Sequence, residues 1–253
     1  MLHRDESKFY FWLGAAFGAG GGVIVDLGSF VGGSTARLAG GMIAGNIDGT
    51  TGGVVHAFDR FTAAPKAKRK VLYSAGIPQF EGDSILALSQ QLLAPFAPHV
   101  VFHPGDINQA RWDSTPIDVL IHDASKTRAS ADRHAAIFWP HLKPGASIVL
   151  QQDMIHSRFP WLAVQMELWA DHFEPLTFVR NGTIAFLCVK RPTDQDLRDR
   201  AISGLSYAED FDLMHRARQR LAPLSRRIDR QLSLALDALA DDEKAGRATD
   251  MPT

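Results

Sequence analysis

The sequence predicts a Rossmann-like α/β core with a mostly parallel sheet, closed by an antiparallel hairpin and followed by a helical extension. Two observations carry this prediction. Short β-branched runs alternate with longer amphipathic segments, and an Asn-Gly turn separates the last two runs. With 253 residues, 45% hydrophobic and 22% charged, the chain can bury one sizeable core. We expect a sheet domain over residues 1–192 and a helical C-terminal extension over residues 193–253.

Seven strands are expected, and each of the first five ends near a Gly, Asp or Pro residue, as buried parallel strands tend to. They cover residues 23–25, 54–58, 99–102, 119–121, 147–150, 173–179 and 183–189. The helix-compatible segments between them are 34–44, 84–93, 129–142 and 160–171. Arg180-Asn181-Gly182 separates the last two strands, and Asn-Gly favours a hairpin because both residues tolerate positive φ.

Bulk composition excludes several classes of protein. The formal net charge is −1, so no overall field favours nucleic acid or a membrane surface. The longest apolar stretch, residues 9–25, is rich in glycine and makes a poor membrane span, and the charged N-terminus does not suit a signal peptide. The single cysteine, Cys188, lies in a strand-like run and should be buried. We expect a cytoplasmic protein with no nucleic-acid or membrane partner and no zinc site.

Residues 194–243 have helical spacing, many Arg, Leu, Ala and Asp residues, and no strand pattern. Their basic face includes Arg216, Arg220, Arg226, Arg227 and Arg230. Such a face suits an amphipathic appendage that packs on the sheet domain, or on the second subunit of a homodimer. It also suits a surface that binds an anionic substrate or partner.

A glycine-rich turn follows the first strand, in Asp26-Leu27-Gly28-Ser29-Phe30-Val31-Gly32-Gly33-Ser34-Thr35. Gly28 lets the backbone turn sharply and approach a ligand closely, and Ser34 or Thr35 could cap the following helix. Amides at the start of that helix suit an anionic group, whereas Asp26 is placed to accept hydrogen bonds from an ammonium group. The glycine spacing departs from the G-x-G-x-x-G pattern of dinucleotide-binding folds, which disfavours a nicotinamide cofactor.

Two further acidic residues stand at the ends of the next two strands. Asp59 ends one strand, where a carboxylate can accept both hydroxyls of a ribose. Asp106 follows the third strand and could accept an adenine amino group. Each of them alone would suit a loop cap. Acids at three successive strand ends form a more specific signal, and they indicate an adenosine-containing ligand.

These segments, with Ile117-Asp118-Val119-Leu120-Ile121-His122-Asp123, resemble motifs of class I S-adenosylmethionine (SAM) dependent methyltransferases. They are most similar to small-molecule O-methyltransferases of the catechol and macrocin types, over about residues 20–190. The terminal hairpin is characteristic of the same fold. The resemblance implies a small-molecule acceptor methylated on a hydroxyl, such as a sugar, polyketide or phenol. It also implies SAM as cofactor, bound by Asp26, Gly28, Ser29, Phe30, Gly32, Ser34, Asp59, Arg60, Asp106, Ile107 and Asp123.

Acidic residues also follow the fourth and fifth strands. Asp123 and Asp153 could together hold Mg²⁺, which prefers oxygen ligands and would lower the pKa of an acceptor hydroxyl. Lys126 could then remove the hydroxyl proton if its own pKa were depressed. The Asp-x-x-Lys spacing resembles that of metal-dependent O-methyltransferases, which implies Asp123 and Asp153 as ligands and Lys126 as base. Those families commonly place Asn or Asp after the second ligand, whereas this chain has Met154; His156 could replace a ligand or act as a general base.

Other interpretations of these residues remain open. Asp123 and Asp153 could simply cap the helices that follow them. His134 suits a helix surface, and the aromatic residues Trp139, Trp161, Trp169 and Phe173 suit the core. A catalytically inactive SAM-fold binding or assembly module is a second hypothesis, and an NAD(P)-dependent oxidoreductase is a third. Only about 20 residues precede the first strand, so we expect the C-terminal helices, or a second subunit, to cover the acceptor.

Overall fold

The computed structural model describes residues 2–46, 52–113, 115–156, 159–180 and 182–244. Seven strands follow the order β3-β2-β1-β4-β5-β7-β6 in one sheet. They are β1 (Val23–Leu27), β2 (Val54–Asp59), β3 (Val100–Pro104), β4 (Val119–His122), β5 (Ile148–Gln151), β6 (Phe173–Val179) and β7 (Thr183–Cys188). The pairs β1–β2, β2–β3 and β4–β5 are parallel, whereas β7 is antiparallel to both β5 and β6. The predicted mostly parallel sheet with a terminal antiparallel hairpin is therefore confirmed.

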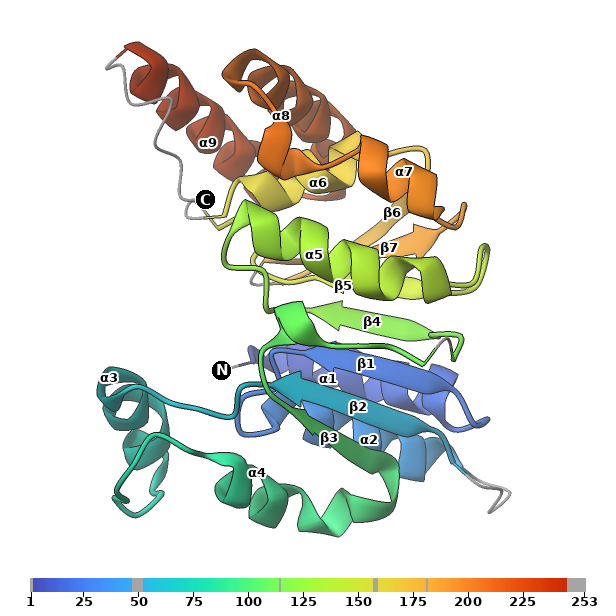
Figure 1. The fold of residues 1–253 in the computed structure, drawn as a ribbon, viewed down its shortest axis with the longest axis vertical. Helices are drawn as coiled ribbons and strands as arrows, with labels where there is room; N and C mark the ends of the chain where they lie inside the picture. The colour runs from blue at the N-terminus through green and yellow to red at the C-terminus, as the bar shows by residue number, and fades with distance from the viewer. Residues whose placement is uncertain (1, 47–51, 114, 157–158, 181, 245–253) are drawn as a thin grey trace. The chain divides into compact units, whose positions relative to one another are not determined.

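The chain divides into two compact units, and the first, Met1–Ala110, contains β1–β3. Its helical segments are α1 (Arg4–Leu13), η1 (Gly14–Gly18), α2 (Gly33–Gly45), α3 (Pro65–Ala67), η2 (Lys68–Leu72), η3 (Tyr73–Ala75), α4 (Leu86–Leu93), η4 (Ala94–His99) and η5 (Ile107–Gln109). α2 lies against β1 and β2, and α1 lies beside α2 (Figure 1). The expected helices at 34–44 and 84–93 correspond to α2 and α4.

The crossing of α1 and α2 brings two backbones into direct contact. A Cβ atom added to Gly41 would lie 2.0 Å from the Phe11 carbonyl oxygen, a separation that atoms cannot adopt. Tyr10, Leu13 and Leu38 are fully buried in the same unit. Glycine at position 41 therefore permits a helix spacing that any side chain would widen.

The second unit, Arg111–Thr253, contains β4–β7. Its helical segments are α5 (Arg128–Phe138), η6 (Trp139–His141), α6 (Trp161–Leu168), α7 (Asp194–Asp199), η7 (Ile202–Gly204), α8 (Tyr207–Leu221), η8 (Ala222–Leu224) and α9 (Arg226–Lys244). The aromatic residues expected in the core are all buried, namely Trp139, Trp161, Trp169 and Phe173, and so is Cys188. β6 and β7 pair from Phe173↔Cys188 to Val179↔Thr183. Asn181, in the turn between them, lies outside the described residues.

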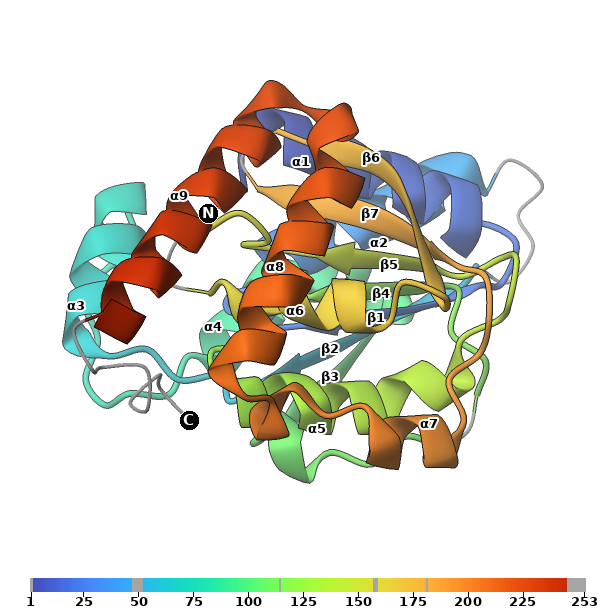
Figure 2. The ribbon, with the colours of Figure 1, turned by 90° about the horizontal axis from the view of Figure 1, so that it is seen from above.

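The C-terminal helices pack within the second unit. α8 packs on α6, and α9 packs beside α8 (Figure 2). Arg128 of α5 and Asp210 of α8 form a buried bidentate ion pair with N–O distances of 2.8 and 2.6 Å. Arg220, from the expected basic face, donates to the carbonyl groups of Met166 and Phe173. Part of the basic face therefore contacts α6 and β6 within this unit. None of the described helices has the length and apolarity needed to cross a membrane.

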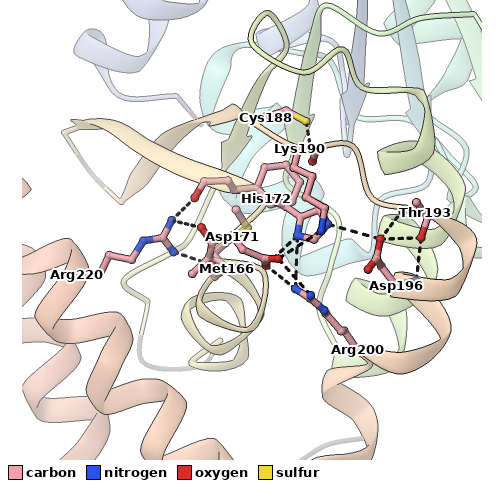
Figure 3. A network of polar contacts seen from close by, with 11 residues as sticks. Met166, Asp171, His172, Cys188, Lys190, Thr193, Asp196, Arg200 and Arg220 are labelled. Atoms are coloured by element: carbon pink, nitrogen blue, oxygen red, sulfur yellow. Dashed lines mark hydrogen bonds and ion pairs between the residues drawn. The ribbon is translucent and has the colours of Figure 1, made fainter.

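A polar network joins α7 to the segment between α6 and β6 (Figure 3). The fully buried His172 ring lies 2.9 Å from the Asp171 carboxylate and 3.7 Å from that of Asp196 on α7. Arg200 donates to both Asp171 oxygens and lies over the Trp169 ring, 5.3 Å from its centroid. The Arg200 hydrogen bond is the main reason why the pKa of Asp171 lies well below its usual range. The network therefore holds the beginning of the extension in place.

Candidate cofactor and acceptor sites

The loop after β1 is shaped by the neighbouring strand. The amides of Gly28 and Ser29 both donate to the Phe58 carbonyl of β2, at 2.8 and 3.3 Å. Gly28 has a φ of +92°, a left-handed conformation that glycine adopts at little cost. The chain thus turns at the carboxyl end of β1, where ligands of open α/β sheets bind.

The start of α2 differs from the sequence expectation. Gly32 is the N-cap, and no side chain caps the helix. The Ser34 and Thr35 hydroxyls instead donate to Asp26 Oδ2, at 2.7 and 2.6 Å. The prediction that Ser34 or Thr35 caps α2 is therefore wrong, because Asp26 takes both hydroxyl groups. Gly32 provides no side-chain cap for the amides at the start of α2, and these amides suit an anionic ligand group.

Asp26 is a buried carboxyl group, with only 1% of its surface exposed. Burial raises its pKa from 3.8 to about 6, against the lowering effect of the Thr35 and Ser34 hydrogen bonds, and the charge of Asp59 raises it further. The ionised form is consequently costly unless a cation comes close. Since both hydroxyls bind Oδ2, Oδ1 retains lone pairs for such a cation. A ligand ammonium group fits this position.

Asp59, at the end of β2, holds two backbone amides. Its Oδ2 accepts from the Phe30 amide at 3.0 Å, and its Oδ1 accepts from the Phe61 amide at 2.6 Å. Phe30 and Phe61 have φ values of 52° and 50°, a conformation that costs about 1–3 kcal/mol in a residue with a side chain. The Phe30 carbonyl accepts from Ser89 of α4 at 3.1 Å, so both of its backbone groups are fixed. Asp59 still has lone pairs for ligand hydroxyls, because a carboxylate offers about four acceptor positions.

Asp106 acts as a cap and as an ion-pair partner. It is the N-cap of η5, where it accepts from the Asn108 amide at 3.0 Å, and Arg60 donates to it at 2.9 Å. The Asn108 backbone hydrogen bond, followed by the Arg60 interactions, lowers its pKa despite a small burial effect. The Asp106 side chain is 40% exposed, whereas Ile107 beside it is buried. Asp106 is therefore an accessible carboxylate next to an apolar side chain.

The residues of the first unit share one edge of the parallel strands β1, β2 and β3. Asp26 and Asp59 are close enough for the charge of one to affect the pKa of the other. Asp59 also binds the loop that begins at Gly28, through the Phe30 amide. The structure thus brings Asp26, Gly28, Phe30 and Asp59 together. This edge of the sheet offers acceptors for amino and hydroxyl groups. Ser89 was missed from the sequence, since a lone serine in an amphipathic helix carries no signal.

In the second unit, Lys126 lies between the two carboxylates expected to bind a metal. Its Nζ is 3.1 Å from Asp123 Oδ1 and 3.2 Å from Asp153 Oδ2. The Phe159 ring centroid lies 5.0 Å from the same nitrogen. Close by in the chain, the His156 amide donates to the Asp153 carbonyl, and its ring lies 5.3 Å from that of Phe159. The structure therefore brings all four predicted residues of the reaction centre into one neighbourhood.

The surroundings of Lys126 decide its protonation. Burial is the largest influence and acts to lower its pKa, but the charges and hydrogen bonds of Asp123 and Asp153 together outweigh it. The pKa of Lys126 is consequently raised above 10.5. A base at this position needs a depressed pKa. In this arrangement Lys126 is a hydrogen-bond donor, and its assignment as the base stays a prediction that the raised pKa disfavours.

The donor set for a divalent metal is small. Within the ranges that the structure describes, no group of three or more His, Cys, Asp and Glu side chains could hold a metal ion. Met154, after Asp153, is buried, and its thioether is a soft ligand unsuited to Mg²⁺. The alternative that Asp123 and Asp153 cap the following helices is wrong, because the N-caps are Thr127 and Pro160.

A second cluster, on the same turn, was not foreseen. Ser125 Oγ contacts Nε2 of His122 and lies 3.0 Å from Nδ1 of His134, and these two ring nitrogens are 3.2 Å apart. Burial lowers the pKa of His122 well below its usual value, and the charges of His134 and Lys126 lower it further. His134 is 3% exposed, so the prediction of a helix-surface position is wrong: the buried polar partners on β4 and its turn draw it inward.

Comparisons with known proteins show the family of the chain and support its fold. A family model described as "Methyltransferase domain" matches residues 25–151, half of the chain. The fold is similar to that of the O-methyltransferase NovP, with 13% identity, coverage of 74% of this chain and 80% of that chain, and a TM-score of 0.54. Two further similar structures have TM-scores of 0.49. One is a methyltransferase from Geobacter sulfurreducens (12% identity, 75% and 82% coverage), and the other is the SAH-bound methyltransferase PaMTH1 from Podospora anserina (13% identity, 74% and 80% coverage).

No curated protein matches the chain. The family match includes β1, the loop after it, β2, β3, β4 and β5, and thus the strand ends that carry Asp26, Asp59 and Asp123. The likeness to NovP, at its low identity, supports the fold. The chain therefore belongs to the Methyltransferase domain family, as a class I, SAM-dependent methyltransferase with a Rossmann-like fold.

Proposed function

We propose that this methyltransferase moves the methyl group of SAM to a hydroxyl group of a small molecule such as a sugar, polyketide or phenol. The observation that carries the cofactor assignment is the row of carboxylates Asp26, Asp59 and Asp106 along three successive parallel strands. Their chemistry matches the amino, ribose and adenine groups of SAM in that order. The hydroxyl acceptor rests on the polar cluster at Lys126 and on the resemblance of its sequence to O-methyltransferases.

Each part of SAM has a matching group in the first unit. The buried Asp26 needs a cation, which the methionyl ammonium supplies, and the amides at the start of α2 suit the methionyl carboxylate. Asp59 would accept the ribose hydroxyls while it keeps the Phe30 and Phe61 amides. Asp106 would accept the adenine amino group, with Ile107 beside the ring. When bound, SAM supplies an electrophilic methyl group on a sulfonium.

The groups that we assign to the acceptor are Asp123, Lys126 and His156. In the transfer, the acceptor oxygen forms a bond to the methyl carbon, the carbon–sulfur bond breaks, and its electron pair stays on sulfur. The hydroxyl proton must pass to a base, and we assign that role to His156, which is exposed and lies beside the Lys126 cluster. Positioning supplies much of the rate in such a displacement. Asp123 and Lys126 would orient the acceptor hydroxyl as acceptor and donor.

Magnesium assistance is the finer part of the proposal, and the donor set does not fit it. Asp123 and Asp153 are oxygen ligands, but the Lys126 ammonium is bound between them. The side chain of the neighbouring Met154 contains no oxygen atom. We therefore derive no step through a metal ion.

The cofactor proposal is tested by isothermal titration calorimetry with SAM and, separately, with NAD⁺. The wild-type protein should bind SAM with micromolar affinity and should not bind NAD⁺. Asp59→Asn should weaken SAM binding roughly 10–100-fold, since a charge-assisted hydrogen bond contributes about 1.5–3 kcal/mol. Glu81→Gln, an exposed acid of the same unit, is the matched control and should bind normally. Absence of SAM binding by the folded wild type would refute the proposal.

An inactive SAM-binding or assembly module is the second candidate. It is favoured by Lys126, which two carboxylates hold as a protonated donor. The two candidates differ in turnover. Formation of S-adenosylhomocysteine with any member of a panel of sugars, polyketides and phenols excludes the inactive module. SAM binding without turnover across that panel supports it.

A further inference from the structure

We propose that the Lys126 ammonium occupies the position between Asp123 and Asp153 that a divalent cation would otherwise take, so that this ammonium holds the acceptor oxygen and no metal is required. Exclusion of a metal ion depends on these three side chains alone. The role toward the acceptor rests on the proposed function.

The Lys126 ammonium forms a bridge between the carboxylates of Asp123 and Asp153. The distances of 3.1 and 3.2 Å from Nζ to the two carboxylates are those of an ammonium hydrogen-bonded on two sides. A Mg²⁺ ion binds oxygen at about 2.1 Å and demands near-octahedral geometry. For a metal to replace the ammonium, each carboxylate would have to approach the centre by about 1 Å. Phe159 adds a third neighbour, with its ring facing the Lys126 charge.

The backbone conformation positions both Lys126 and Asp153 for this bridge. The Lys126 amide donates to the Ala124 carbonyl at 3.0 Å, so the turn folds back and places Lys126 on the side of Asp123. Asp153 has a φ of +56°, which is rare for a residue with a side chain. Its neighbours hold it there: the Gln152 amide donates to the His122 carbonyl, and the Met154 amide donates to the Gly182 carbonyl. These backbone hydrogen bonds therefore fix the direction of the Asp153 side chain.

The charge and the N–H donors of Lys126 also favour the ammonium over a metal ion at this position. A divalent ion placed between the two carboxylates would lie close to the Lys126 ammonium, and repulsion between the two positive charges would require Lys126 to leave. An ammonium has three N–H donors, and Asp123 and Asp153 use two of them. The third can bind an acceptor oxygen and stabilise negative charge that develops on it as its proton leaves. Lys126 would thereby perform the orienting task of a metal.

The test measures metal binding directly and needs no acceptor. Mn²⁺, as a spectroscopic probe for Mg²⁺, is titrated into chelator-treated full-length protein and free Mn²⁺ is followed by electron paramagnetic resonance. The wild type should show no Mn²⁺ binding at this site. Lys126→Met removes the ammonium at similar side-chain length, and should create a site that binds Mn²⁺ at least about ten-fold more tightly. Lys126→Gln is a second variant, and Asp153→Asn added to Lys126→Met should abolish the new site.

Two outcomes would overturn the inference. The first is a wild type that binds Mn²⁺ as tightly as Lys126→Met and loses it in Asp153→Asn, since the ammonium would then exclude nothing. The second is a pair of folded variants, Lys126→Met and Lys126→Gln, that bind no Mn²⁺, since the two carboxylates would then not form a cation position. SAM titration on the same samples keeps the two proposals apart. Absence of SAM binding by the wild type would refute the cofactor assignment. The Mn²⁺ result tests metal exclusion independently of SAM binding.

Discussion

Replacing Asp26 by asparagine should separate stability from cofactor binding. The side chains are nearly equal in shape, and the asparagine oxygen can still accept from the Ser34 and Thr35 hydroxyls. The exchange removes a negative charge from a site that is 1% exposed. We therefore expect the unliganded Asp26→Asn protein to gain stability relative to the wild type at neutral pH, and to lose affinity for SAM.

The size of the expected change in the free energy of unfolding follows from the pKa of Asp26. Burial raises the pKa of Asp26 from 3.8 to about 6, so protonation stabilises the native state below pH 3.8, and this stabilisation is lost as the pH rises through 6. The whole effect is about 3 kcal/mol, at about 1.4 kcal/mol for each pKa unit. Nearly half of it, about 1.4 kcal/mol, falls between pH 5 and pH 8. Asp26→Asn lacks this loss, so its advantage over the wild type should grow by that amount from pH 5 to pH 8.

The assay is urea unfolding of both unliganded proteins at pH 5, 6, 7 and 8, followed by tryptophan fluorescence. The free energy of unfolding is compared between the proteins at each pH, because other titrating groups then cancel. Asp237→Asn, at an exposed position of α9, is the matched control and should show a constant difference. A difference between Asp26→Asn and the wild type that does not change with pH would refute the burial argument. A difference that shrinks toward pH 8 would mean that the pKa of Asp26 is lowered.

Three further predictions concern packing, the buried ion pair and the pH dependence of binding. Gly41→Ala should lower the free energy of unfolding by about 1–3 kcal/mol in urea, because its Cβ would overlap a carbonyl oxygen of α1, whereas Gly33→Ala has open space and should cost little. Arg128→Met should lower the free energy of unfolding by about 3–5 kcal/mol, because it leaves Asp210 buried without its partner. Adding Asp210→Leu should restore much of this loss. A double variant that is no more stable than Arg128→Met would contradict the prediction. SAM affinity, measured by calorimetry from pH 5 to 8, should fall by up to about ten-fold for each pH unit below 6, because Asp26 must lose its proton to pair with the ammonium group. An affinity that does not change with pH would show that Asp26 does not contact this cation.

Local pattern was enough to predict the sheet and the row of acids. Parallel strands are buried on both faces, so they appear as short continuous apolar runs, and the hairpin follows from its Asn-Gly turn. Asp26, Asp59 and Asp106 were identifiable because each follows or ends such a run. The start of α2 was misassigned even so, since a hydroxyl residue at a helix start has the same local pattern whether it caps the helix or binds a carboxylate elsewhere.

The partners of these groups depend on contacts between segments that are distant in the chain. Asp59 holds the Phe30 amide 29 residues away, and His134 turns inward to Ser125 and His122 although its helix pattern suits the surface. Lys126 and Asp153 are separated by 27 residues, and their contact is the basis of our proposal that an ammonium takes the place of a metal ion. A sequence shows which groups can donate, accept or carry charge. Which of them meet, and how far burial shifts their pKa, is set by the packing of the folded chain, because hydrogen bonds and desolvation act over only a few ångströms.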